Sequence, residues 1–282
     1  MNILYNNNKP TLGTKSSDNQ ELLVSLKTST IFWGKTMAYK LLSVDNNPKV
    51  MKGNKLQDKY WSVILHLAPS DLADGKRTVC PYAKIAMCEE PCLNTAGLGG
   101  VYPSIQNARV RKTLLFLDEY ETFMEQLVDD INRFIRACDR KDKKPCVRLN
   151  GTSDIQWEHQ LYKGKTVFEM FPSVQFYDYT KIPTRKIEGI DNYHLTWSYS
   201  EANKKYAKLF DTVRNNKAVV FRGEKPKTFL GLKVIDGDTH DMRFLDEDNV
   251  VVGLKAKGKA KKDYSGFVVD NLIEARAIVW WY

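Results

Sequence analysis

Three of the five cysteines in this chain lie within thirteen residues, at Cys80, Cys88 and Cys92. In a chain without a secretory signal, cysteines this close together are typical of metal binding or redox chemistry rather than of a disulfide framework. A closed structural zinc site needs four ligands. Three thiolates therefore predict a metal whose remaining position is either filled from elsewhere in the chain or left open to a reacting molecule.

The identity of the metal depends on what completes its coordination. The spacing is Cys-x7-Cys-x3-Cys, and a [4Fe-4S] cluster held by three thiolates leaves one iron free to bind a small molecule. Zinc would instead need a fourth ligand, which Cys138, Cys146 or one of the four histidines could supply. The thiols could also be unliganded, although Pro81 and Pro91 place them in a polar loop rather than a core. We favour the cluster, keep zinc as the alternative, and expect Cys138 and Cys146 to pack in the interior.

The elements that must position these thiols follow from the apolar pattern. Residues 61–67 (WSVILHL) form a short β-branched apolar run, which predicts a buried strand, and residues 105–117 and 120–138 predict helices. Because strand-like runs recur downstream with segments between them, the chain predicts an α/β fold with a mostly parallel sheet, open or like a partial (βα) barrel. These runs are residues 146–149, 174–177, 194–197, 218–221 and 233–235, and residues 201–214 form the clearest helix between them.

Three further features complete the predicted organisation. Residues 242–245 and 250–254, joined by an acidic turn, predict a C-terminal β-hairpin. Residues 1–25 are polar without a sustained period and predict an N-terminal arm. Residues 26–282 then form a single α/β domain, with the cysteine-rich metal loop at residues 70–104.

Polar side chains follow several predicted strands at the point where each strand ends. Reacting groups in α/β folds lie on loops at the carboxyl ends of the strands, which is also where the cysteine loop leaves residues 61–67. Asp154 is a candidate acid or base, and Lys181 is a candidate contact for phosphate or carboxylate. We predict catalytic roles for these two residues and cofactor-binding roles for Asn150, Gly151, Ser198 and Arg222.

The formal net charge of +9 is unevenly distributed. Lysines crowd into residues 255–262, and residues 140–144 carry four more cations. A solvated basic face or contact with nucleic acid would both explain these segments. The competing hypothesis is therefore a zinc-stapled binding protein without catalysis, which grips nucleic acid through both basic segments.

Composition and termini limit the setting of the protein. No apolar run is long enough to span a membrane, so no membrane partner is expected. The N-terminus lacks a basic region followed by an apolar stretch, so no signal peptide is evident. A reducing, cytoplasmic setting follows as the expectation.

The order of four segments resembles a bacteriophage family, gene product 88, from about residue 30 onward. The segments are CPYAKIAMCEEPCLNTAGLGG, VRLNGTSDIQWE, VQFYDYTK and DGDTHDMRFLDEDNVVVGLKAKG. The resemblance implies a phage-encoded protein that acts in the cytoplasm of the infected host, and the family name implies no particular activity.

More loosely, the cysteine loop is similar to that of radical S-adenosylmethionine enzymes, which place three cysteines after the first strand of a partial (βα) barrel. Carried over, the three cysteines would hold a [4Fe-4S] cluster, and residues 150–154 would lie near the methionine end of S-adenosylmethionine. The usual spacing is Cys-x3-Cys-x2-Cys with an aromatic residue before the last cysteine, whereas this chain has Pro91 there. The leading hypothesis is a phage-encoded metalloenzyme that binds S-adenosylmethionine or a nucleotide at the open metal position.

Overall fold

A computed structural model describes residues 41–44, 48–213 and 215–270. The arm predicted over residues 1–25 lies outside the described residues. No helix in the described ranges is both long enough and apolar enough to cross a lipid bilayer.

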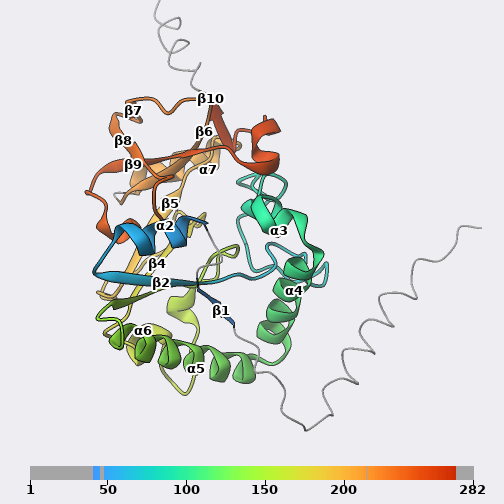
Figure 1. Ribbon diagram of the computed structural model, residues 1–282. Coiled ribbons are helices and arrows are strands. Elements are labelled where there is room, and N and C mark those ends of the chain that lie inside the picture. The colour runs from blue at the N-terminus through green and yellow to red at the C-terminus, as the bar shows by residue number, and fades with distance from the viewer. Residues whose placement is uncertain (1–40, 45–47, 214, 271–282) are drawn as a thin grey trace, which may run out of the picture. The chain divides into compact units, whose positions relative to one another are not determined.

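One mixed sheet organises the described chain (Figure 1). Its strand order is β1-β2-β3-β4-β5-β6-β9-β8-β7, and the strands from β2 to β8 along this order are parallel. The predicted strands correspond to β2, β3, β4, β5, β6 and β8, which confirms the α/β class and the mostly parallel sheet. In the described residues the sheet is open, because its end strands β1 and β7 pair on one side only. The strands are β1 (Leu42–Ser43), β2 (Tyr60–Leu65), β3 (Lys144–Arg148), β4 (Gln175–Thr180), β5 (Tyr193–Ser198), β6 (Lys217–Arg222), β7 (Thr228–Phe229), β8 (Leu232–Asp236), β9 (Val250–Lys255) and β10 (Val268–Asp270).

Helical segments contribute to an apolar layer over one face of this sheet. Helix α5 buries Phe123, Leu127, Ile131 and Phe134, which recur at three- and four-residue steps as predicted for an amphipathic helix. Figure 1 shows α4 and α5 joined at a bend, and the two helices carry the chain from the cysteine loop back to β3. The helices are α2 (Pro48–Leu56), α3 (Gly97–Val101), α4 (Pro103–Asp118), α5 (Tyr120–Asp139), α6 (Val167–Met170) and α7 (Lys204–Leu209), with short 3₁₀ turns η2 (Leu93–Thr95), η3 (Trp157–His159), η4 (Phe210–Thr212), η5 (Arg243–Leu245) and η6 (Gly258–Lys262).

The other face of the sheet buries polar groups among apolar side chains. The hydroxyl groups of Ser62 and Tyr177 hydrogen-bond at 2.7 Å, and Arg148 forms an ion pair with Asp241. The η5 segment covers this face, and the ring of Phe244 packs 5.5 Å from the ring of Tyr177. Because side chains alternate between the two faces of a strand, β2 and β3 contribute apolar residues to one layer and polar residues to the other.

The C-terminal hairpin exists but lies earlier in the chain than the sequence predicts. Residues 243–245 form the turn η5, and β9 is a central strand between β6 and β8 rather than a hairpin arm. Strand β9 is parallel to both neighbours, and the burial of Val250, Val251 and Val252 suits a strand covered on both faces. The hairpin is β7–β8, whose turn residues Leu230 and Gly231 both have positive φ, as a two-residue hairpin turn requires.

The parallel strands bring their carboxyl ends to one edge of the sheet, and this edge is split. Strand β5 pairs with β6 only through Trp197 and Ser198, and further along β6 its place is taken by β10. The chain after β5 therefore leaves the sheet and meets the cysteine loop, where the hydroxyl of Ser200 donates to the carbonyl of Ala86 at 2.9 Å.

Candidate metal centre

The cysteine loop is fixed to the carboxyl ends of two strands. The amide of Asp154, after β3, donates to the carbonyl of Val79 at 2.8 Å, and the amide of Val79 donates to the carbonyl of Ser70 at 3.1 Å. On the other side Ser200, after β5, holds Ala86 as described above. The loop thus lies at the carboxyl edge of the sheet, as predicted from the parallel arrangement.

The three loop cysteines are half-buried neighbours. Electrostatic interaction links every pair among Cys80, Cys88 and Cys92. The sulfur of Cys80 lies 3.8 Å from the carbonyl of Thr152, and the sulfur of Cys92 accepts a 3.4 Å hydrogen bond from the amide of Asn94 at the start of η2. Three thiols from one loop therefore gather at one place and remain partly accessible.

Burial keeps these thiols protonated in the absence of a metal. It raises the pKa of all three, that of Cys88 to about 11. Two cations act in the opposite direction, because Lys181 lowers the pKa of Cys88 and Arg109 lowers that of Cys92. Metal ligation needs thiolates, so binding at this place must release protons.

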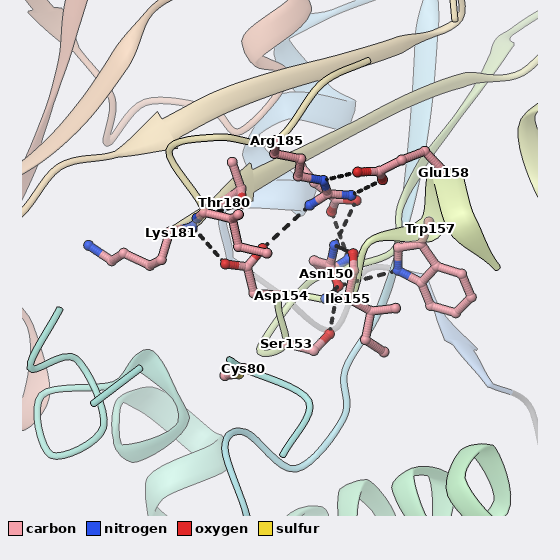
Figure 2. Close-up of polar contacts among 12 residues, drawn as sticks. Cys80, Asn150, Ser153, Asp154, Ile155, Trp157, Glu158, Thr180, Lys181 and Arg185 are labelled. Carbon is pink, nitrogen blue, oxygen red and sulfur yellow. Dashed lines mark hydrogen bonds and ion pairs between the residues drawn. The ribbon is translucent and has the colours of Figure 1, made fainter. Parts of the chain in front are cut away.

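Lys181, which was selected from the sequence as a site residue, is a cation near the thiols. Burial lowers the pKa of its ammonium to about 8, while Cys88 and Asp154 act in the opposite direction. The ammonium donates to the carbonyl of Tyr199 at 3.1 Å and lies 4.5 Å from the ring centroid of Phe267. Figure 2 shows its side chain extending away from the carboxylate of Asp154. Lys181 is therefore a cation close to the thiols with a backbone carbonyl as its hydrogen-bond partner.

Arg109 is a second cation that the sequence gave no reason to select. Its guanidinium hydrogen-bonds the side chain of Asn94 and interacts with Cys92. The glycine run after the cysteines makes room for it, because a Cβ on Gly99 would lie 2.7 Å from the guanidinium. The glycine run forms the short helix α3, and the absence of a side chain at Gly99 allows Arg109 to pack closely against it.

Asp154 is bound into a buried ion network (Figure 2). Its carboxylate accepts from the amide of Lys181 at 2.7 Å and from Arg185 at 3.4 Å. Arg185 also donates to both oxygens of Glu158, at 2.7 and 2.6 Å, and to the hydroxyl of Tyr193 at 2.8 Å. Burial raises the pKa of Asp154, and Arg185 opposes that rise. Both oxygens of Asp154 are thus engaged, and a role as catalytic acid or base stays a prediction.

Asn150 and Gly151 shape the loop after β3. The side-chain oxygen of Asn150 accepts from the hydroxyl of Ser153 and the amide of Ile155, both at 2.9 Å, and from the indole of Trp157 at 3.2 Å. The amide of Gly151 donates to the carbonyl of Leu65 at 3.0 Å, which joins this loop to the end of β2. Asn150 and Gly151, both predicted to contact a cofactor, therefore form hydrogen bonds that hold the loop after β3 in place.

Asp178 is a buried carboxyl group beneath this loop. It accepts from the amide of Asn150 at 2.6 Å and from the hydroxyl of Tyr193 at 3.1 Å. Burial raises its pKa to about 7, against the attraction of Arg148. The sequence places Asp178 after a strand predicted over residues 174–177, whereas in the structure it lies within β4.

Ser198 and Arg222 are not brought to the cysteines. Ser198 pairs with Ala218 inside the sheet, and Ser200 makes the contact to the cysteine loop instead. Arg222 forms a 2.5 Å ion pair with Asp270 and lies 4.1 Å from the ring centroid of Tyr264. It holds the segment that follows β9 against the sheet.

Zinc and an iron–sulfur cluster, the two metals that the sequence predicts, need different sets of ligands. Within the described residues no group of three or more His, Cys, Asp or Glu side chains forms a ready-made site for a metal ion. The other two cysteines, Cys138 and Cys146, interact with each other at the opposite edge, at the end of α5 and the start of β3. No histidine in that same part of the chain acts on the pKa of the three thiols. Zinc would draw its sulfurs to about 2.3 Å from a single point, whereas a cluster distributes three thiolates over different irons. Three thiolates with no fourth cysteine or histidine of the described residues acting on them are the set expected for a cluster, and the choice of metal stays a prediction.

His66 directly follows β2, and we expect this half-buried base to control acid stability. Burial lowers its pKa to about 3, with Arg109, Arg148 and Lys112 acting in the same direction and Asp241 against them. The unfolded chain takes up the proton below about pH 6.5 and the folded chain does not, so the folded state loses stability as pH falls from 6.5 toward 3. Each pH unit in that window is worth about 1.4 kcal/mol.

The measurement is the free energy of unfolding of the wild type and of His66→Gln between pH 7 and pH 4. The variant should lack this part of the acid sensitivity, so the two curves should converge or cross as pH falls. His159→Gln, at an exposed histidine, is the matched control and should follow the wild type. Parallel curves for the wild type and the His66 variant would contradict the assignment.

Comparison with known proteins places this sequence in a family. A profile described as gene product 88 matches residues 40–271, which is most of the 282-residue chain and includes all four quoted segments. No curated protein and no solved structure matches the chain. The looser similarity to radical S-adenosylmethionine enzymes therefore receives no support from these comparisons.

Proposed function

The chain belongs to the bacteriophage gene product 88 family, and we propose that this phage protein binds an iron–sulfur cluster through Cys80, Cys88 and Cys92. The observation that carries the proposal is the gathering of three half-buried thiols at the carboxyl edge, with the other two cysteines at the opposite edge. Three thiolates leave one iron of a [4Fe-4S] cluster open to a small molecule. Such a cluster would supply electron transfer or an open iron as a Lewis acid.

The surroundings of the thiols support an anionic group at this place. A cluster with three thiolate ligands is negatively charged, and a buried negative charge needs nearby cations. Lys181 lies on the Cys88 side and Arg109 on the Cys92 side. The same two cations would orient the carboxylate or phosphate of a bound molecule, which suits S-adenosylmethionine or a nucleotide.

Exposed apolar side chains directly follow the cysteines in the chain. Leu93, Leu98, Val101 and Tyr102, in and around α3, are all exposed by half or more of their side-chain surface. An exposed apolar group of this size beside polar ligands is typical of a binding surface. It would exclude water from the cluster once a substrate is bound.

The test is anaerobic purification of the full chain followed by iron, acid-labile sulfide and zinc analysis. We expect about four irons and about four sulfides per chain, because that is the content of one cubane cluster. One zinc per chain without sulfide would overturn the cluster and favour a structural metal.

In the competing hypothesis, both basic segments bind the same nucleic acid, but the two segments lie at opposite edges of the sheet. Residues 140–144 precede β3, at the amino edge, whereas residues 255–262 follow β9, at the carboxyl edge of the same parallel strands. The second segment is also partly neutralised, since Lys257 pairs with Asp238 at 2.8 Å and Lys259 with Glu90 at 3.4 Å. A single grip over both segments is therefore not favoured.

A further inference from the structure

A cavity of about 280 Å³ lies at the amino edge of the sheet, opposite the cysteine loop. It is formed where the end of α2, the start of β2 and the turn after α5 meet. Its size is near the lower end for small-molecule sites, which suits a single nucleotide rather than a longer segment. The lining residues are Met51, Asn54, Lys55, Tyr60, Trp61, Lys141 and Lys143.

Trp61 gives this cavity a rigid aromatic surface. Its indole packs against Phe134 of the core, with ring centroids 5.4 Å apart. The ammonium of Lys141 lies 4.0 Å from the indole centroid, in a cation–π contact. A nucleobase has a planar π-face that can stack on such an indole, and displacing one lysine side chain would make room for it.

The charge around the cavity favours a phosphate. Residues 140–144 carry four cations and one carboxylate, and residues 52–59 carry three cations and one carboxylate. The ammonium of Lys143 hydrogen-bonds the carbonyl of Asp58, whose own side chain is fully exposed and 4.0 Å away. An exposed cluster of lysines beside an aromatic ring is the combination that binds the backbone and bases of nucleic acids.

We propose that this cavity binds one nucleotide, with its base on Trp61 and its phosphate held by Lys55, Lys141 and Lys143. The nucleotide could be free or part of a single strand, because both present the same base and phosphate. The site shares no residue with the proposed cluster and lies at the other edge of the sheet, so loss of the cluster should leave this binding unchanged.

The experiment is fluorescence anisotropy of the full chain with a short fluorescein-labelled oligodeoxythymidylate, at two salt concentrations. Loss of one base stack should weaken binding of Trp61→Leu roughly tenfold. Lys141→Gln and Lys143→Gln should each weaken binding and reduce the salt dependence by about one phosphate contact. These two lysine variants test the proposal even if Trp61→Leu fails to fold.

Lys84→Gln is the matched control, since Lys84 is exposed and lies in the cysteine loop at the other edge. It should bind like the wild type. Equal weakening by Lys84→Gln, or full binding by both lysine variants of the cavity, would overturn the proposal. Competition by a mononucleotide as strong as by unlabelled oligonucleotide would identify a free nucleotide as the ligand, and competition by the oligonucleotide alone would identify a strand.

Discussion

Replacing Cys88 by alanine should yield protein without iron, against about four irons per chain in the wild type. Only three thiols gather at the proposed site, so removing one leaves two, with no other cysteine near enough to replace it. Cys88 is the informative position because it interacts with both other thiols and with Lys181. Iron and sulfide content after anaerobic purification, together with the visible absorbance, gives the result.

Cys146→Ala is the matched control for this variant. Cys146 is a buried thiol at the start of β3, so its truncation creates a small core defect without touching the proposed ligands. It should retain the full iron content. Iron that survives Cys88→Ala would show that the thiol is not a ligand, and iron lost from both variants would point to general loss of folding.

Much of this fold could be predicted because its strands are local in the sequence. The apolar run at residues 61–67 predicts a buried strand without any knowledge of its neighbours, and β2 lies there. The run at residues 250–254 was equally visible, but its strand β9 pairs in parallel with both β8 and β6, and β6 is separated from it in the chain by β7 and β8. An acidic turn before an apolar run looks the same whether the run becomes a hairpin arm or a central strand, so the pairing could not be predicted.

At the site, too, features set by the local sequence could be predicted, and contacts between residues far apart in the chain could not. Parallel strands place their carboxyl ends together, which was enough to predict that Asp154 and Lys181 would lie beside the cysteine loop. The partner of Asp154 is Arg185, which lies 31 residues further along, in a loop without a periodic pattern. The sequence around Arg222 did not indicate its ion pair with Asp270. The sequence around Ser198 did not indicate that this residue would lie within the sheet.

At the carboxyl edge, the cations and the carboxylates near the cysteine loop have different kinds of partner. Lys181 and Arg109, whose hydrogen-bond partners are neutral, act on Cys88 and Cys92, whereas the carboxylate of Asp154, which acts on Cys80 and Cys88, is paired with Arg185. An anionic centre would be favoured by the first arrangement and protected from repulsion by the second. Because Asp154 also holds the loop through Val79, the ion network is the part of the fold on which the position of Cys80 most depends.

Replacing Arg185 by methionine should therefore destabilise the protein by about 3–5 kcal/mol, the usual cost of breaking a buried ion pair by removing one partner. The side chain of Arg185 is fully buried, and those of Glu158 and Asp154 are 3% and 7% exposed, so the variant leaves two carboxylates without their cation. The measurement is the free energy of unfolding in denaturant at neutral pH. Arg77→Met is the matched control, because Arg77 pairs with Asp74 and Asp118 at the surface, where solvent screens the pairs and their loss should have little effect.

The pH dependence of the Arg185 variant distinguishes unpaired charge from lost packing. Without the guanidinium, the pKa of the Asp154 carboxyl group in the folded state should rise further above its unfolded value, because burial raises it and Arg185 no longer opposes that rise. A carboxyl group whose folded pKa is raised makes the folded state lose stability as pH rises through that window. The deficit of Arg185→Met relative to the wild type should thus be smaller at pH 5 than at pH 8. A deficit that is constant with pH would mean that the side chain acts through packing, and the electrostatic account of this edge would be wrong.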